Sequence, residues 1–175
     1  MRLNPDDEAL PVMVPRNDRA LVAMSANRVQ RLRHHLTVLM ARMQTSEPAG
    51  LPRPEPEGFA GRVARNACAL CRGWCCRNGA DDAFLDEPTL ARAGFDAEAV
   101  IQHYLSRVPA ETYDGSCIFH GERGCTLDRS MRSDVCNAYL CGGLHAYLKG
   151  DDTVSPVVVI AGERDNMRRS RVLVP

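Results

Sequence analysis

The sequence predicts a small, helix-rich α+β domain with a cysteine cluster and a short hairpin, preceded by an N-terminal amphipathic helix. Three observations point to this class. The chain has 175 residues, of which 45% are apolar, and this is the size and composition of one modest globular domain. Apolar residues recur at helical spacing near the start of the chain. All eight cysteines fall between positions 68 and 141.

The net charge and the residues at the start of the chain restrict the classes of function that the protein can have. The 22 basic and 22 acidic residues cancel, which excludes a global attraction to nucleic acid or acidic membranes. Arginines gather in residues 164–171 without aromatic neighbours, a composition that argues against nucleic-acid binding. No segment approaches the ~20 apolar residues that span a bilayer, and residues 1–15 lack a signal-peptide run. We therefore expect a cytoplasmic protein that does not bind membranes.

The distribution of prolines and cysteines divides the chain. Four prolines within residues 46–58 disfavour a helix and indicate a semi-rigid spacer. The predicted segments are an N-terminal arm and amphipathic helix (1–45), a Pro-rich linker (46–58), a cysteine-cluster metal-binding domain (59–150), and a C-terminal strand with a basic tail (151–175).

An amphipathic helix is predicted over residues 18–45. Its apolar or small positions are spaced three and four apart, and Asp18 is a suitable N-cap. The stripe comprises Val22, Ser25, Val29, Leu32, Leu36, Leu39 and Met43. Two interpretations stay open: a short coiled coil that forms a homodimer or binds a protein partner, and packing against the helix's own domain.

Capping and turn residues predict the elements of the cysteine-rich region. Asp86 and Asp96 precede helical stretches, the second from Ala97 to about Arg107, and residues 116–128 have the pattern of a hairpin. Ser133 is positioned to cap a helix over residues 134–140, and Gly142-Gly143 reads as its stop signal. A strand is expected over Pro156–Ala161, followed by a frayed tail over residues 164–171.

The first four cysteines form a C-x2-C-x3-C-C run: Cys68, Cys71, Cys75 and Cys76. A two-residue gap allows a tight turn to bring two sulfurs to ~2.3 Å from one ion. Cys75 and Cys76 are adjacent, and neighbouring side chains diverge in both helix and strand. The pair therefore serves different centres, or one of the two thiols ligates while the other is packed or redox-active.

The second set comprises Cys117, Cys125, Cys136 and Cys141, whose wide spacing requires a folded scaffold to converge. In a reducing compartment clustered thiols are metal ligands or redox-active groups more often than disulfides, although a disulfide framework is an alternative. Thiolates select zinc, copper(I) or iron-sulfur clusters. We therefore expect all eight cysteines to ligate an iron-sulfur cluster or Zn²⁺; the spacing does not choose the number of ions.

This cysteine order resembles that of the bacterial YkgJ-type family, described as zinc- or iron-chelating domains. The resemblance is carried by Cys68 to Cys76, Cys117-Ile118-Phe119, Cys125-Thr126-Leu127 and the stretch from Arg132 to Cys141. It departs from the family where the loop before the double cysteine is one residue longer, Ser133 replaces the usual proline, and Asn137 replaces the usual arginine. These departures bear on the geometry of the ligands.

The resemblance implies a metal-binding accessory protein that is redox-linked or handles metal. Flagellin lysine methylases have a similar cysteine pattern, so an enzyme that uses the metal centre for protein modification is one alternative. The chain has no G-x-G-x-x-G loop after a strand, and its catalytic residues are unknown. A structural zinc module that presents the helix over residues 18–45 to a partner is the other alternative.

Overall fold

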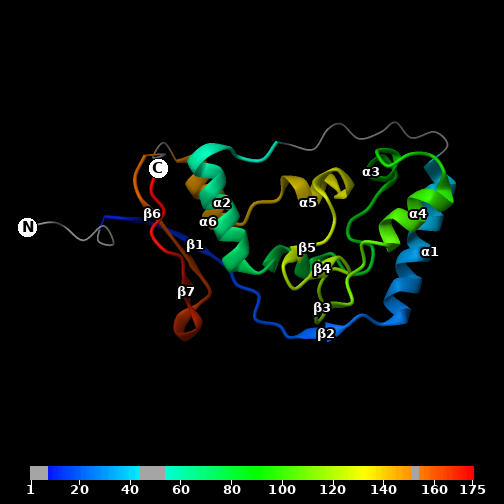
Figure 1. The fold of residues 1–175 in the computed structure, drawn as a ribbon, viewed down its shortest axis with the longest axis horizontal. Coiled ribbons are helices and arrows are strands. Elements are labelled where there is room, and N and C mark those ends of the chain that lie inside the picture. Colours follow the sequence, from blue (N-terminus) through cyan, green and yellow to red (C-terminus); the bar gives the residue numbers. More distant parts are fainter. Residues whose placement is uncertain (1–7, 44–53, 151–153) are drawn as a thin grey trace, which may run out of the picture. The chain divides into compact units, whose positions relative to one another are not determined.

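The computed structural model describes residues 8–43, 54–150 and 154–175 (Figure 1). These residues form two compact units. Within the described residues, unit 1 draws on 8–18, 54–74, 140–150 and 154–175, and unit 2 on 19–43 and 75–139. Both contain helices and short strands, which confirms the α+β class. Most of the predicted linker lies outside the described residues, and no helix in the described ranges is long and apolar enough to cross a membrane.

Unit 1 is organised around a three-stranded sheet in the order β1-β6-β7. Strand β1 (Leu10–Val14) runs parallel to β6 (Val157–Ala161), and β7 (Arg168–Arg169) pairs antiparallel with β6. The predicted strand at β6 is confirmed. Residues within the predicted frayed tail instead form β7 and a 3-10 turn, η4 (Arg164–Asn166), because the β6 backbone offers them a pairing edge.

Two helices, α2 (Gly58–Cys71) and α6 (Gly142–Lys149), pack against β1 and β6 (Figure 1). Their apolar side chains share one core with the sheet, including Val63, Leu144 and Val159. The predicted stop signal at Gly142-Gly143 was wrong, because α6 begins there. A Cβ on Gly143 would lie 1.6 Å from the Met13 carbonyl oxygen, so glycine at this position serves the close approach of the helix to β1.

In unit 2, helix α1 (Ala26–Arg42) is shorter than the predicted helix over residues 18–45. The Ser25 hydroxyl, not the Asp18 carboxylate, caps it by accepting from the backbone N–H of Arg28. The start moves because β2 (Leu21–Ala23) pairs antiparallel with β3 (Glu111–Tyr113), which holds that stretch extended. Strand pairing through the backbone thus overrides the side-chain periodicity of this stretch.

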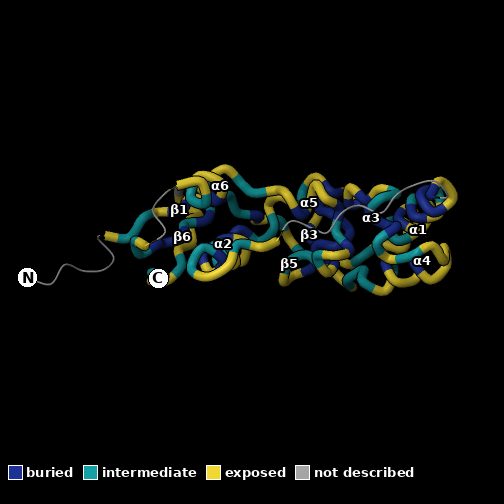
Figure 2. Tube along the Cα trace, turned by 90° about the horizontal axis from the view of Figure 1, so that it is seen from above, coloured by how far each residue is buried: buried dark blue, intermediate teal, exposed yellow. Residues whose placement is uncertain are grey.

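The apolar stripe of α1 is buried within unit 2. Leu32, Leu36, Leu39 and Met43 all join its core, where α1 packs against α3 (Glu87–Ala91) and α4 (Ala97–Leu105). Figure 2 shows exposed and buried stretches alternating along α1 and α4, as expected for amphipathic helices. The stripe therefore packs on its own domain; the homodimer or protein partner stays a prediction.

The helices α3 and α4 begin at the predicted caps. The Asp86 carboxylate accepts from the backbone N–H of Thr89 at 3.0 Å, and the Asp96 carboxylate from that of Ala99 at 3.0 Å. The remaining elements of unit 2 are short: β4 (His120–Gly121), β5 (Gly124–Cys125), η3 (Arg129–Met131) and α5 (Asp134–Ala138). The predicted hairpin and the Ser133 cap are confirmed, and α5 ends two residues before the predicted boundary.

Removing the N-cap of α3 tests how much this helix end contributes to the stability of unit 2. Asp86 also accepts from the Thr89 hydroxyl, so Asp86→Ala leaves two donors without their acceptor. We expect the free energy of unfolding to fall by ~1 kcal/mol, the usual cost of losing an N-cap, as measured by urea denaturation. Asp86→Asn, which keeps an acceptor oxygen, is the matched control; an equal loss in both variants would contradict the capping role.

Candidate metal centre

None of the eight cysteines forms a disulfide bond, and the two units divide them unequally. Unit 2 contains five of them: Cys75, Cys76, Cys117, Cys125 and Cys136. Unit 1 contains three: Cys68, Cys71 and Cys141.

Three of the unit 2 thiols lie at its apolar core. Cys117 is a buried member of the core, and Cys76 and Cys125 are partly buried against it. A backbone hydrogen bond joins Cys117 and Cys76: the N–H of Cys117 donates to the carbonyl oxygen of Cys76 at 2.8 Å. We call Cys76, Cys117 and Cys125 the inner thiols. Cys75 and Cys136 belong to exposed residues, and we call them the outer thiols.

Gly79 makes room for the Cys117 thiol. A Cβ at this position would lie 2.8 Å from Cβ of Cys117, closer than real contacts allow, and 3.0 Å from its Sγ, tighter than most real contacts. The Gly79 N–H also donates to the carbonyl oxygen of Cys76 at 3.3 Å. Sequence reasoning missed this residue. Its place three residues after a double cysteine is the only signal in the sequence, and the close contact with Cys117 depends on the fold.

The hairpin places Cys125 beside this group. Cys125 on β5 pairs with His120 on β4. The loop that leads into the hairpin is held by the Thr112 hydroxyl, which lies 3.1 Å from the carbonyl oxygen of Cys117 and 2.9 Å from that of His120. His120 itself is fully buried against the Tyr113 ring, with 4.6 Å between ring centroids. The seven-residue gap between Cys117 and Cys125 is thus closed by a turn and a two-residue hairpin.

Cys136 enters the site from the first turn of α5. The Ser133 hydroxyl accepts from the backbone N–H of Cys136 at 3.2 Å, so Ser133 contributes the N-cap of this turn. The Cys136 thiol points toward the carbonyl oxygen of Ala83, with 3.9 Å between sulfur and oxygen. This donor contact and the cap hold Cys136 in place although its residue is exposed.

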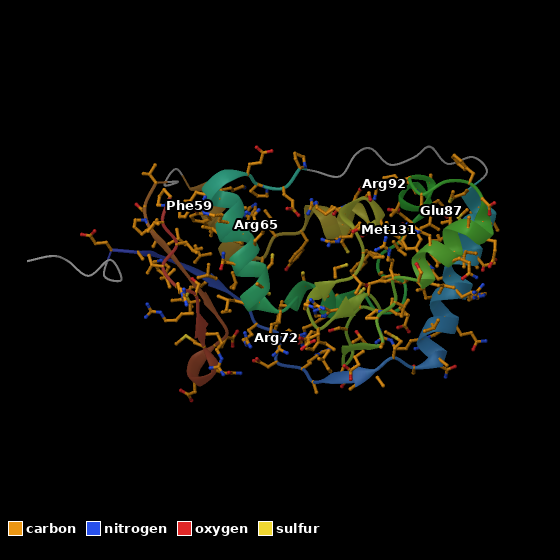
Figure 3. The ribbon with its side chains drawn as sticks, in the orientation of Figure 1. Phe59, Arg65, Arg72, Glu87, Arg92 and Met131 are labelled. Atoms are coloured by element: carbon orange, nitrogen blue, oxygen red, sulfur yellow. The ribbon has the colours of Figure 1, made fainter. Side chains whose placement is uncertain are left out.

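The loop between the hairpin and α5 is held by side-chain donors. Arg92 donates to the carbonyl oxygens of Ser130 and Arg132, and the Tyr104 hydroxyl donates to that of Met131 at 2.9 Å. Asn137 donates to the carbonyl oxygens of Arg129 and Arg132. Figure 3 shows Arg92 and Met131 close together in this part of unit 2. These hydrogen bonds fix the backbone of Arg132. Its positive charge acts to lower the pKa of both outer thiols, Cys75 and Cys136.

Neighbouring thiols affect the ionisation of four unit 2 cysteines, Cys75, Cys76, Cys117 and Cys136. The side chains of Cys75 and Cys76 form a hydrogen bond. This bond lowers the pKa of Cys75 to about 7 and raises the pKa of Cys76. The Cys117 and Cys125 thiols raise the pKa of Cys76 further. Burial raises the pKa of Cys117 to about 12, and burial with the charges of Cys125 and Cys75 raises that of Cys136. Sulfurs from three stretches of the chain therefore lie within electrostatic reach of one another.

The Cys75–Cys76 hydrogen bond predicts a pH dependence in the metal-free protein. The thiolate is the reactive form, so alkylation of Cys75 should be half-maximal near pH 7 and level off above it. In Cys76→Ala the donor is lost and the pKa of Cys75 should rise toward the ordinary thiol value of ~8.5, which slows alkylation at pH 7 by roughly tenfold. Peptide mass spectrometry of iodoacetamide-treated protein measures the rate.

Arg123→Gln, on the exposed hairpin turn, is the control and should leave the pH profile of Cys75 unchanged. An unshifted profile in Cys76→Ala would show that the neighbouring thiol does not set the ionisation of Cys75.

The unit 1 thiols have a different setting. Cys68 and Cys71 lie in the last turn of α2, not in the tight turn expected from their spacing. Behind them Arg72 and Gly73 adopt positive φ values of 52° and 66°, and this turn brings the N–H of Trp74 to 3.4 Å from Sγ of Cys71. Cys71 is buried in the core of unit 1, against which Cys141, at the N-cap of α6, also packs.

Among the described residues, no three His, Cys, Asp or Glu side chains stand as a group that could hold a metal ion. Whether a metal suits this site therefore depends on the chemistry of its thiol ligands. The inner thiols are soft ligands at an apolar core, and Gly79 packs closely against one of them, Cys117. This donor chemistry suits zinc or iron-sulfur ligation. Ligation requires the thiols to turn toward a common point.

No protein-family model matches the chain, and neither a curated protein nor a solved structure matches it. The resemblance to the YkgJ-type family stays a prediction that rests on the order of the cysteines.

Proposed function

We propose that this protein is a metal-handling accessory protein that binds zinc or an iron-sulfur cluster. The proposed ligands are four thiols of unit 2, Cys76, Cys117, Cys125 and Cys136. The observation that carries the proposal is the packing of Cys76, Cys117 and Cys125 at the same apolar core, where the Cys117 N–H donates to the Cys76 carbonyl oxygen at 2.8 Å. Cys125 and Cys136 lie close enough to Cys117 to raise the pKa of its thiol. The four thiols come from three stretches that lie far apart in the sequence. Free thiols that only fill a core have no reason to gather in this way.

Burial and charge favour a bound cation at this site. Four thiolates so close together would repel one another, and burial already holds the thiols of Cys117 and Cys136 protonated at neutral pH. A divalent ion or a cluster removes those protons and offsets the negative charge. Arg132 acts on Cys75 and Cys136, and Arg28 on Cys117, in the direction that stabilises the thiolates. The remaining charge of a four-thiolate site is thus partly balanced by the protein.

The surrounding structure supports a defined site. Cys76 and Cys117 are joined by a backbone hydrogen bond, Cys125 sits on a two-strand pair, and Cys136 lies on a capped helical turn. Hydrogen bonds therefore hold the backbone at or beside each of these four cysteines. Such preorganisation lowers the entropic cost of binding.

The experiment is elemental analysis combined with the electronic spectrum of protein purified without oxygen. Brown protein, with broad visible absorption that dithionite bleaches, supports the iron-sulfur form. Colourless protein with bound zinc supports the zinc form. Protein that contains neither metal and takes up neither zinc nor iron with sulfide contradicts the proposal.

A further inference from the structure

The backbone of strand β2 in unit 2 is paired with β3 in an antiparallel ladder. The N–H of Asp114 donates to the carbonyl oxygen of Ala20 at 2.9 Å, and the register places Val22 opposite Thr112 two residues further along. Hydrogen-bonded and non-hydrogen-bonded pairs alternate in such a ladder. Val22 and Thr112 therefore exchange the backbone hydrogen bonds between the two strands.

The other edge of β2 is open. Because Leu21 and Ala23 flank the hydrogen-bonded pair, their N–H and C=O groups face away from β3. Within residues 8–43, 54–150 and 154–175, no hydrogen bond reaches these backbone groups. Figure 1 shows β2 at the lower margin of unit 2, with β3 on one side. Such an edge offers donors and acceptors at the spacing of an extended chain, which is the group that can pair with them.

The free charged side chains beside this edge are carboxylates. Glu111 lies opposite Ala23 in the register and is exposed, and its carboxylate has no partner among the described residues. Asp114, at the other end of the ladder, is also exposed, and its carboxylate is unpaired in the part of the chain that the structure describes. Both groups attract a basic segment.

The arginines of this region are already engaged. Arg28 and Arg31 form ion pairs with the same carboxylate, that of Asp81. The Arg19 guanidinium donates to the carbonyl oxygen of Asp114 at 2.9 Å. The negative charges of Glu111 and Asp114 are thus the ones left for a partner.

A groove of about 450 Å³ lies beside β2. Val22 and Ala23 line it from the strand, and Asp114 and Ser116 line it from the turn that follows β3. The Ser116 hydroxyl is fully buried and has no hydrogen-bond partner elsewhere in the described ranges. The groove therefore offers two oxygen acceptors to a basic side chain, the Asp114 carboxylate and this hydroxyl.

We propose that the open edge of β2 binds an extended basic segment of a partner protein, which adds to β2 and β3 as a third strand. Strands lie about 4.8 Å apart, so a residue of the added strand opposite Ala23 has its backbone about 10 Å from that of Glu111. A lysine or arginine at this position reaches across the small Ala23 side chain to the Glu111 carboxylate. Neither the thiols of unit 2 nor a bound metal takes part in this contact.

The test measures binding of a fluorescein-labelled heptapeptide of alternating valine and lysine to the full chain by fluorescence anisotropy. A second peptide has glutamate in place of lysine, and a third is N-methylated at alternate residues, which blocks backbone pairing. We expect saturable binding of the lysine peptide with a Kd below about 1 mM, and at least about tenfold weaker binding of the other two.

Three variants locate the contact. Ala23→Pro removes an outward N–H and leaves the bonds to β3 in place, so it should weaken binding at least about tenfold. Glu111→Gln keeps the shape of the side chain and should weaken binding about two- to fivefold, as expected for an exposed ion pair. Glu57→Gln changes an exposed acid of unit 1 that makes no side-chain cap bond, and it should have no effect. Circular dichroism checks that each variant is folded.

Several results would overturn the inference. The first is the absence of saturable binding of the lysine peptide to the wild-type chain. Equal binding of the glutamate or the N-methylated peptide would exclude the charge or the backbone pairing, and Glu111→Gln tests the contact even if Ala23→Pro fails to fold. Self-association that Ala23→Pro abolishes, without peptide binding, would place a second copy of this chain on the edge instead.

Discussion

Replacing Cys117 by serine is expected to weaken zinc or cadmium binding to unit 2 more than about a hundredfold, because changes behind the ligands alone cost 10–100-fold. Cys117 is the most buried of the inner thiols, and its backbone N–H is bound to Cys76. Competition titration against a chelator of known affinity measures the loss.

The matched control for this variant is Cys75→Ser, which removes a thiol from the same unit and should retain tight binding. Thermal unfolding of the metal-free proteins checks that Cys117→Ser is still folded, since a buried hydroxyl replaces a thiol there. Equal affinities for Cys117→Ser and the wild-type chain would contradict the assignment of Cys117 as a ligand.

Replacing Gly143 by alanine is expected to destabilise unit 1 by about 3 kcal/mol or more, at the upper end of overpacking effects. The new Cβ would lie 1.6 Å from the carbonyl oxygen and 2.7 Å from the carbonyl carbon of Met13. Both are backbone atoms of β1, so they cannot rotate away as a side chain would. Either α6 or the strand must move, and both contribute to the unit 1 core.

The neighbouring Gly142→Ala is the control, because nothing lies within 4 Å of a Cβ there and the backbone is compatible with alanine. We expect it to be neutral or to stabilise the chain by ~0.5–1 kcal/mol. Denaturant unfolding of both variants measures the difference. Similar stabilities for the two would show that α6 does not approach β1 as closely as described.

Local signals predicted many of the elements. Asp86, Asp96 and Ser133 cap their helices as expected because a capping side chain binds a backbone N–H only two or three residues away. The hairpin at Cys125 is equally local. Features that depend on distant partners were missed. Strand β1 contains Pro11 and is recognisable only by its pairing with β6, and the start of α1 depends on the pairing of β2 with β3.

The candidate site shows the same division. Residue type predicted a thiol cluster, since the density of cysteines is a property of the sequence. The spacing of the cysteines could not predict which thiols group together, because Cys71 and Cys75 are four residues apart and yet belong to different units. Gly79 and the side-chain donors on the loop before α5 were also missed, because their roles arise from contacts across unit 2.

The central claim is that four thiols of unit 2 bind one thiophilic centre, and protection from alkylation tests it most directly. The intact chain is treated with iodoacetamide with and without bound metal, and each cysteine is quantified by peptide mass spectrometry. We expect bound metal to protect Cys76, Cys117, Cys125 and Cys136 from alkylation. Protection confined to Cys68, Cys71 and Cys141, or protection of no cysteine at all, would contradict it.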